Sequence, residues 1–173
     1  MSCRVLSGYD FKYLGKFSDI NGVVHKYKFL SSKTNKSYIV EFEYIYENFY
    51  GVKFYLFDYK KSKNRYKMLS NLNEASMVIS TCLLIGVDFF HKFPDASFGF
   101  VGERKEGEDV RCTKRYRVYK RLVESYVSSA LFVHYSLEEY SAYCLINKNV
   151  LDTDAFMSDL KSFMRETFVN FDQ

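Results

Sequence analysis

The stretch LNEASMVISTCLLIGVDFFHKFPDA, Leu72 to Ala96, decides the fold of this chain of 173 residues. Asn73 is predicted to cap a helix, since its side chain can accept a hydrogen bond from a first-turn amide, and Pro94 is predicted to stop it. The apolar residues in between keep helical spacing and spread around most of the circumference, which indicates a helix buried on nearly all sides. They are Ala75, Val78, Ile79, Cys82, Leu83, Gly86, Phe89 and Phe90 on the main stripe, extended by Met77, Leu84 and Ile85.

The residues before this helix alternate between apolar and polar side chains, as half-buried antiparallel strands do. The clearest segment is SYIVEFEYIY at 37–46, with VHKYKFL at 24–30, YGVKFYLFDY at 50–59 and an earlier strand near residues 9–14. Short turns separate the segments, so the sequence predicts a β-meander. The meander is predicted to bury Val40, Phe42, Phe54 and Leu56 against Val78, Ile79, Cys82 and Leu83.

Shorter elements are expected after the helix. ASFGFVG at 96–102 is predicted to be an inner strand that ends at Gly102, and the charged loop ERKEGED follows it. We expect a helix from about Thr113, one or two strands within residues 130–147, and a closing helix. Asp152 or Thr153 caps that last helix, whose apolar stripe is Phe156, Leu160, Phe163, Met164 and Phe168.

This order of elements predicts the fold class. It is α+β: an antiparallel β-meander packed on a buried central helix, followed by strand, helix, strand and helix. The length suits one hydrophobic core, so we expect a single domain over residues 1–173.

Composition and cysteine spacing predict the compartment. The net charge of +4 is mild, and Cys3, Cys82, Cys112 and Cys144 lie too far apart for a typical zinc site, so reduced thiols are expected. The N-terminus lacks the apolar region of a signal peptide. The longest uncharged run, residues 75–87, is shorter than the roughly 20 residues that cross a bilayer. The sequence therefore predicts a cytoplasmic protein without a membrane partner.

Two basic runs are the strongest candidates for a binding site. VRCTKRYRVYKRLVESY at 110–126 has six Lys or Arg residues between Arg111 and Arg121, and KKSKNRYK at 60–67 has five. If the first run forms a helix, its charged residues lie along one stripe and its aromatic residues along another. We expect the aromatic stripe to pack on the sheet, with the side chain of Tyr119 pointing into the core. The first run is either a solvated helix face or an anion site at a helix N-terminus. The candidate residues for binding an anion or nucleic acid are Lys60, Lys61, Lys63, Arg65, Lys114, Arg115, Arg117 and Arg121.

These runs favour a nucleic-acid or polyanion-binding protein that uses a basic helix. Tyrosines beside both runs offer rings on which bases can stack: Tyr59, Tyr66, Tyr116 and Tyr119. Two alternatives stay open. One is a protein–protein interaction module that docks an acidic partner or a second copy of the chain, and the other is a nuclease, with or without a metal ion.

Catalytic, metal and cofactor sites are not expected. PDASFGFVGERK at 94–105 formally matches a metal-nuclease pattern, with Asp95 and Glu103 as the carboxylates. Glu103, however, lies in a charged loop and not on a buried strand. The three histidines are scattered along the chain, and Glu41 lies on a strand face that we expect to be exposed.

Several short motifs give the chain a resemblance. They are LSNLNE at 69–74, FFHKFPDA at 89–96, Gly102, and the series Arg115, Arg117 and Tyr119. In this combination the chain resembles a group of small bacterial α+β proteins of unassigned function. The resemblance implies the fold more than an activity, and it implies a toxin–antitoxin, phage-defence or mobile-element setting. The inserted stretch ERKEGEDVRCTK departs from the group's pattern, in which the strand leads directly into the arginine pair.

Overall fold

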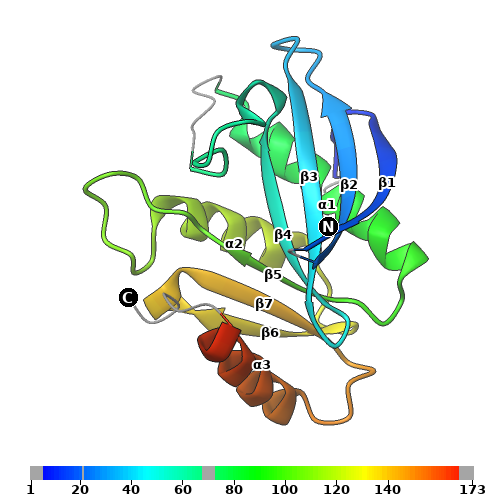
Figure 1. Ribbon diagram of the computed structural model, residues 1–173, viewed down its shortest axis with the longest axis vertical. Coiled ribbons are helices and arrows are strands. Elements are labelled where there is room, and N and C mark those ends of the chain that lie inside the picture. Colours follow the sequence, from blue (N-terminus) through cyan, green and yellow to red (C-terminus); the bar gives the residue numbers. More distant parts are fainter. Residues whose placement is uncertain (1–5, 21, 68–72, 168–173) are drawn as a thin grey trace, which may run out of the picture.

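The structure, a computed structural model, describes residues 6–20, 22–67 and 73–167 (Figure 1). Within these ranges seven strands form one sheet, and three helices pack on it. The strands are β1 (Phe11–Asp19), β2 (Gly22–Leu30), β3 (Ser37–Tyr46), β4 (Phe49–Leu56), β5 (Ser97–Val101), β6 (Phe132–Leu137) and β7 (Ala142–Asn147). The helices are α1 (Ala75–Lys92), α2 (Lys114–Tyr126) and α3 (Thr153–Thr167), with single 3₁₀ turns at Phe57–Tyr59 and Glu138–Tyr140.

The sheet consists of two antiparallel parts joined by one parallel pair. Its strand order is β1-β2-β3-β4-β5-β7-β6. The first four strands form the predicted meander, and β5, β7 and β6 pair antiparallel beyond it. Strand β5 runs parallel to β4, because α1 carries the chain back across the sheet between them. The predicted α+β class, with a meander packed on the first helix, is therefore confirmed.

Helices α1 and α2 cover one face of the sheet, and α3 covers the other (Figure 1). One apolar cluster joins the meander to α1 and α2, and a second one joins β7 to α3. At the centre of the first cluster Phe89 is fully buried, and its ring stacks on Phe42 at 4.3 Å between centroids. The predicted contact between meander and helix is confirmed for Val40, Phe42, Leu56 and Val78, which are buried in this cluster. Phe54, Cys82 and Leu83 are only partly buried against it, and Ile79 is buried but lies outside this cluster.

Helix α1 is not buried on nearly all sides, so this part of the prediction is wrong. Its sheet-facing side is buried, whereas Val87 is 51% exposed. The chain before β1 covers part of the outer side: the backbone amide of Tyr9 donates to Thr81 Oγ1 at 2.9 Å. By length and composition alone α1 could cross a membrane, but its packing on the sheet is that of a core helix in a soluble domain.

The predicted cap of α1 is also wrong. Asn73 has a φ of 53°, in the left-handed region, and Glu74 is the N-cap residue. The Glu74 side chain does not cap the helix. Instead, its carboxylate is 4% exposed and accepts hydrogen bonds from four hydroxyl groups. The donors and distances are Ser31 at 2.5 Å, Tyr38 at 2.7 Å, Tyr9 at 3.0 Å and Thr34 at 3.1 Å.

The other two helices begin where the sequence predicts. Thr113 caps α2, since its Oγ1 accepts a hydrogen bond from the amide of Tyr116 at 3.2 Å. Asp152 caps α3, since its Oδ1 accepts from the amides of Asp154 and Ala155. The predicted stripe of α3 is buried at Phe156 and Leu160, and Phe168 lies outside the described residues.

Candidate polyanion-binding surface

The two basic runs, far apart in the sequence, meet in the structure. The guanidinium group of Arg115, in the first turn of α2, donates to the carbonyl of Tyr66 at 2.9 Å and to that of Lys67 at 3.0 Å. A planar guanidinium group with several N–H donors can hold two carbonyls at once, whereas an ammonium group is a single point charge. Arg115 therefore fixes the end of the 57–67 segment against the start of α2.

The 57–67 segment is also held against the sheet. The Arg65 guanidinium lies over the rings of Tyr55 and Tyr66, at 5.0 and 4.7 Å from their centroids. The Tyr66 hydroxyl accepts from Arg65 and donates to Glu41 at 2.5 Å. Arg65 and Arg115 thus hold the segment in place, and we describe both as positioning residues.

Glu41 is not on an exposed face, which corrects the prediction. It is 4% exposed, because Tyr55 and Tyr66 lie over this part of β3 and donate to it. Lys26 pairs with its carboxylate at 2.9 Å. Burial alone would raise the pKa of Glu41, but the hydrogen bonds from Tyr66 and Lys26 outweigh it and lower the pKa.

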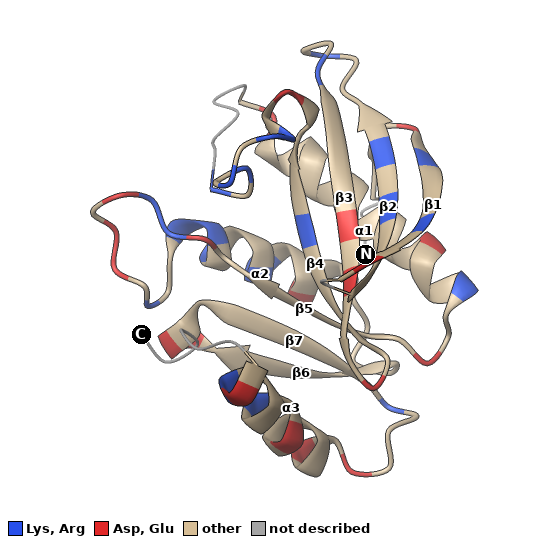
Figure 2. Cartoon of the chain, viewed as in Figure 1, with Lys and Arg blue, Asp and Glu red and all other residues tan. Residues whose placement is uncertain are grey.

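The other six candidate residues are exposed or lie at the surface. Figure 2 shows Lys and Arg on the 57–67 segment and at the start of α2, with both signs of charge in the loop before α2. Lys60 packs its ammonium 4.1 Å from the centroid of the Phe57 ring. On α2 the exposed charges follow one stripe, as predicted. The six exposed residues are Lys60, Lys61, Lys63, Lys114, Arg117 and Arg121.

The predicted anion position at the start of α2 is occupied by the chain itself. Glu108 Oε1 accepts from the amide of Lys114 at 2.7 Å, and its Oε2 accepts from the amide of Lys105 at 2.9 Å. These backbone hydrogen bonds lower the pKa of the Glu108 carboxyl. A carboxylate at this position offsets the cations in the first turn of α2, which oppose the helix dipole. An external anion could therefore contact the basic side chains here, but not the backbone amide of Lys114.

The aromatic side of α2 faces the core, as predicted for Tyr119. Tyr116 is fully buried, and the Tyr119 ring lies 5.6 Å from Phe100 and 5.9 Å from Phe54 between centroids. Burial raises the pKa of Tyr119 to about 12. Since Tyr66 is also engaged with the sheet, three of the four tyrosines proposed for base stacking are used inside the protein.

The residues of the nuclease pattern do not come together. Asp95 precedes β5 and accepts from the side-chain amide of Asn149, whereas Glu103 follows β5. The seven residues between them, 96–102, are mostly extended chain and separate the two by roughly 20 Å. Among the described residues, no group of three or more His, Cys, Asp or Glu residues is placed to hold a metal ion. The geometry therefore gives no support to a metal site at this pattern.

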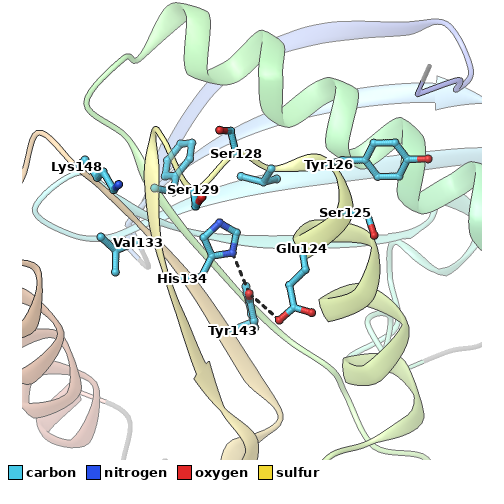
Figure 3. Close-up of a pocket in the computed structure, with 11 residues that line it drawn as sticks. Glu124, Ser125, Tyr126, Ser128, Ser129, Val133, His134, Tyr143 and Lys148 are labelled. Atoms are coloured by element: carbon cyan, nitrogen blue, oxygen red, sulfur yellow. Dashed lines mark hydrogen bonds between the residues drawn. The ribbon is translucent and has the colours of Figure 1, made fainter. Parts of the chain in front are cut away.

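A hydrogen-bonded series that no sequence pattern indicated lies at the far end of α2 (Figure 3). Tyr143 donates to Glu124 at 3.3 Å, and its oxygen lies 2.9 Å from His134 Nδ1. An ionised carboxylate only accepts, so the tyrosine donates to it and its oxygen accepts from Nδ1–H. His134 Nε2 is then an acceptor. It is buried and has no hydrogen-bond partner in the described part of the chain.

This arrangement predicts an acid-sensitive histidine. Burial lowers the pKa of His134 from its ordinary 6.5, and the weaker effect of Glu124 acts the other way. Because the folded-state pKa is below the unfolded one, the stability from neutral His134 is present above pH 6.5 and is lost as the pH falls. We expect a midpoint below 6.5 in an NMR titration, with the resonance assigned by His134→Gln. A midpoint at or above that value would contradict the buried, neutral state.

Comparison of the chain with protein-family models, with curated proteins and with solved structures gives no match.

Proposed function

We propose that this protein binds a polyanion, with a nucleic acid as the ligand that fits best, across a surface formed by the 57–67 segment and α2. The observation that carries the proposal is the pair of hydrogen bonds from Arg115 to the carbonyls of Tyr66 and Lys67. It converts two separate basic runs into one surface. Among the described residues Cys82, Cys112 and Cys144 are free thiols, which suits the cytoplasm, where such ligands occur.

The proposed contact is with phosphates and not with bases. The exposed cations sit on long, solvated side chains, which neutralise phosphates without identifying a sequence. Stacking would need exposed rings, but Tyr66, Tyr116 and Tyr119 pack inside the protein. We therefore expect single-stranded RNA and duplex DNA to bind with little sequence preference and with a strong dependence on salt.

Charge reversal on either segment is expected to weaken binding. The two variants are Lys61→Glu with Lys63→Glu, and Arg117→Glu with Arg121→Glu. Each removes two phosphate contacts, so each should flatten the salt dependence by about two units of slope and weaken binding at least about tenfold. Fluorescence anisotropy with labelled RNA and DNA at several salt concentrations measures both quantities.

The matched control is Lys12→Glu with Lys16→Glu, which makes the same change in net charge on β1, an edge strand three places from β4 in the sheet. The control is expected to lose much less affinity. Equal losses of affinity in all three variants would show that only net charge matters. A loss of affinity in the α2 variant alone would show that the 57–67 segment is not part of the binding surface. If the wild type binds neither nucleic acid at low salt, the proposal is wrong.

A further inference from the structure

The sheet opens at the parallel pair between its two parts. Within the described strands, the β4–β5 ladder joins three residue pairs, Phe49 with Ser97, Tyr50 with Phe98 and Gly51 with Gly99. Beyond them β4 continues to Leu56 along β3, whereas β5 turns away with β7 and leads to the loop before α2 (Figure 1). The two parts of the sheet therefore diverge on the side where α2 begins.

A cleft of about 910 Å³ lies at this divergence. This volume is in the range of small-molecule sites, which are typically apolar with a few polar groups. Its walls come from α1 and α2, and its lining continues between the strands to α3. Apolar side chains in the walls include Phe54, Leu83, Phe90, Phe100, Tyr119 and Leu160.

Gly86 shows that part of this space is open. It lies in the interior of α1 and lines the cleft, and a Cβ atom added there would meet nothing within 4 Å. Glycine in a helix interior is unfavourable relative to alanine, and no crowding here requires it. The missing side chain leaves room on the wall of the cleft.

Exposed apolar side chains gather at the same place. Val87, Val101, Val118 and Leu131 are each at least 40% exposed, and all four line the cleft. They come from α1, from β5, from α2 and from the segment before β6. Apolar surface that converges on a concave site from several elements is typical of a site for an apolar ligand.

The charges on the lining favour a ligand with an anionic end. Lys105, Lys114 and Arg115 line the cleft near the start of α2, together with one carboxylate there, Glu103. Of the other charged residues in the lining, Lys53 and Glu43 form an ion pair with each other, and Lys161 belongs to α3. Glu108, which accepts from the amides of Lys105 and Lys114, adds a second carboxylate beside this end. Three cations against two carboxylates leave the end positive, which suits a carboxylate ligand.

We propose that this cleft binds a long-chain fatty acid, with the hydrocarbon tail between α1 and α2 and the carboxylate at Lys105 and Lys114, beside the positive charge of Arg115. The tail would cover the exposed valines, and the head would meet the positive end of the cleft. This site shares Lys114 with the polyanion surface, and Val118 lies on the same face of α2 as Lys114 and Arg121. Gly86 belongs to α1, so a change at Gly86 tests the cleft without altering the exposed stripe of α2.

The test uses cis-parinaric acid, a fluorescent fatty acid, and the corresponding alcohol. The wild type is expected to bind the acid saturably with one site, and at least tenfold more tightly than the alcohol. Gly86→Phe and Val118→Trp fill the cleft from opposite walls, and each is expected to weaken binding of the acid at least tenfold. Gly86→Ala, the matched control, adds one methyl group and is expected to bind within a few fold of the wild type.

Thermal melts of the same variants show whether a loss of acid binding comes from filling the cleft or from unfolding of the protein. The affinity for RNA is expected to be the same in Gly86→Phe and in the wild type. Failure of one proposal therefore leaves the other standing. Absence of acid binding, or equal binding by wild type, Gly86→Phe and Val118→Trp, would overturn the assignment. Equal affinity for acid and alcohol would overturn the role of the basic end. Dimers in sedimentation without acid binding would mean that a second copy of the chain covers the apolar residues.

Discussion

Replacing Gly102 by alanine is expected to destabilise the protein severely. An added Cβ atom would lie 2.4 Å from the backbone nitrogen of Tyr116 and 2.6 Å from its Cα. Both are main-chain atoms of α2, so a change of rotamer cannot relieve the contact and the helix itself must move. Overpacking costs roughly 1–3 kcal/mol of unfolding free energy and occasionally more, and displacement of backbone places this change at the upper end of that range.

The contact matters because Gly102 holds three elements together. Its amide donates to the carbonyl of Ser141 at 2.8 Å, and its carbonyl accepts from Thr113 Oγ1 at 2.6 Å. Thr113 is also the N-cap of α2. Shifting the helix away from Gly102 would therefore weaken the cap and move Arg115, which positions the 57–67 segment.

Urea unfolding followed by circular dichroism measures the loss, and Gly86→Ala is the control. The control makes the same chemical change inside α1, where the space is open, and is expected to stabilise the protein by about 0.5–1 kcal/mol. Similar midpoints for Gly102→Ala and the wild type would mean that β5 and α2 are not held as closely as described.

The elements of the fold were predictable because each one rests on a local pattern. Period-two alternation in 37–46 identified β3, and Thr113 and Asp152 marked the starts of two helices. Exposure was harder to predict, because it depends on what covers a residue. Glu41 fits an exposed strand face by its pattern, but Tyr66, 25 positions later, closes over it. Likewise, the apolar pattern of α1 does not show which side the sheet leaves open.

The candidate site also combines features that local patterns predict with contacts that they do not. Its amphipathic stripe and the inward side chain of Tyr119 follow from helical spacing, and the structure has both. The bond from Arg115 to Tyr66 spans 49 positions, so no local pattern could indicate it. The series from Glu124 through Tyr143 to His134 joins α2 to two strands for the same reason. Sequence spacing thus identified the charged residues but not which of them position others.

Replacing Glu74 by alanine is the second large effect that we expect. The carboxylate joins the start of α1 to residues before β1, to the turn between β2 and β3, and to β3 itself. Its removal leaves four hydroxyl groups without their charged acceptor. Hydrogen bonds to a charged group contribute about 1.5–3 kcal/mol each, and relaxation of the partly exposed hydroxyls reduces the sum, so we expect a loss of roughly 3–4 kcal/mol. Chemical unfolding measures it, with the exposed Glu139→Ala as control.

The pH dependence separates the charge of Glu74 from its packing. Burial would raise the pKa of Glu74, but the hydrogen bonds from Ser31 and Tyr38, with those from Tyr9 and Thr34, lower it below its ordinary 4.5. The stability that this carboxylate contributes is therefore fully present above pH 4.5 and is lost as the pH falls through the lower, folded-state pKa. Glu74→Gln has a similar size and no charge, so the difference in unfolding free energy between it and the wild type should shrink over that acidic range. A difference that stays constant with pH would mean that the hydroxyl groups hold a neutral side chain equally well.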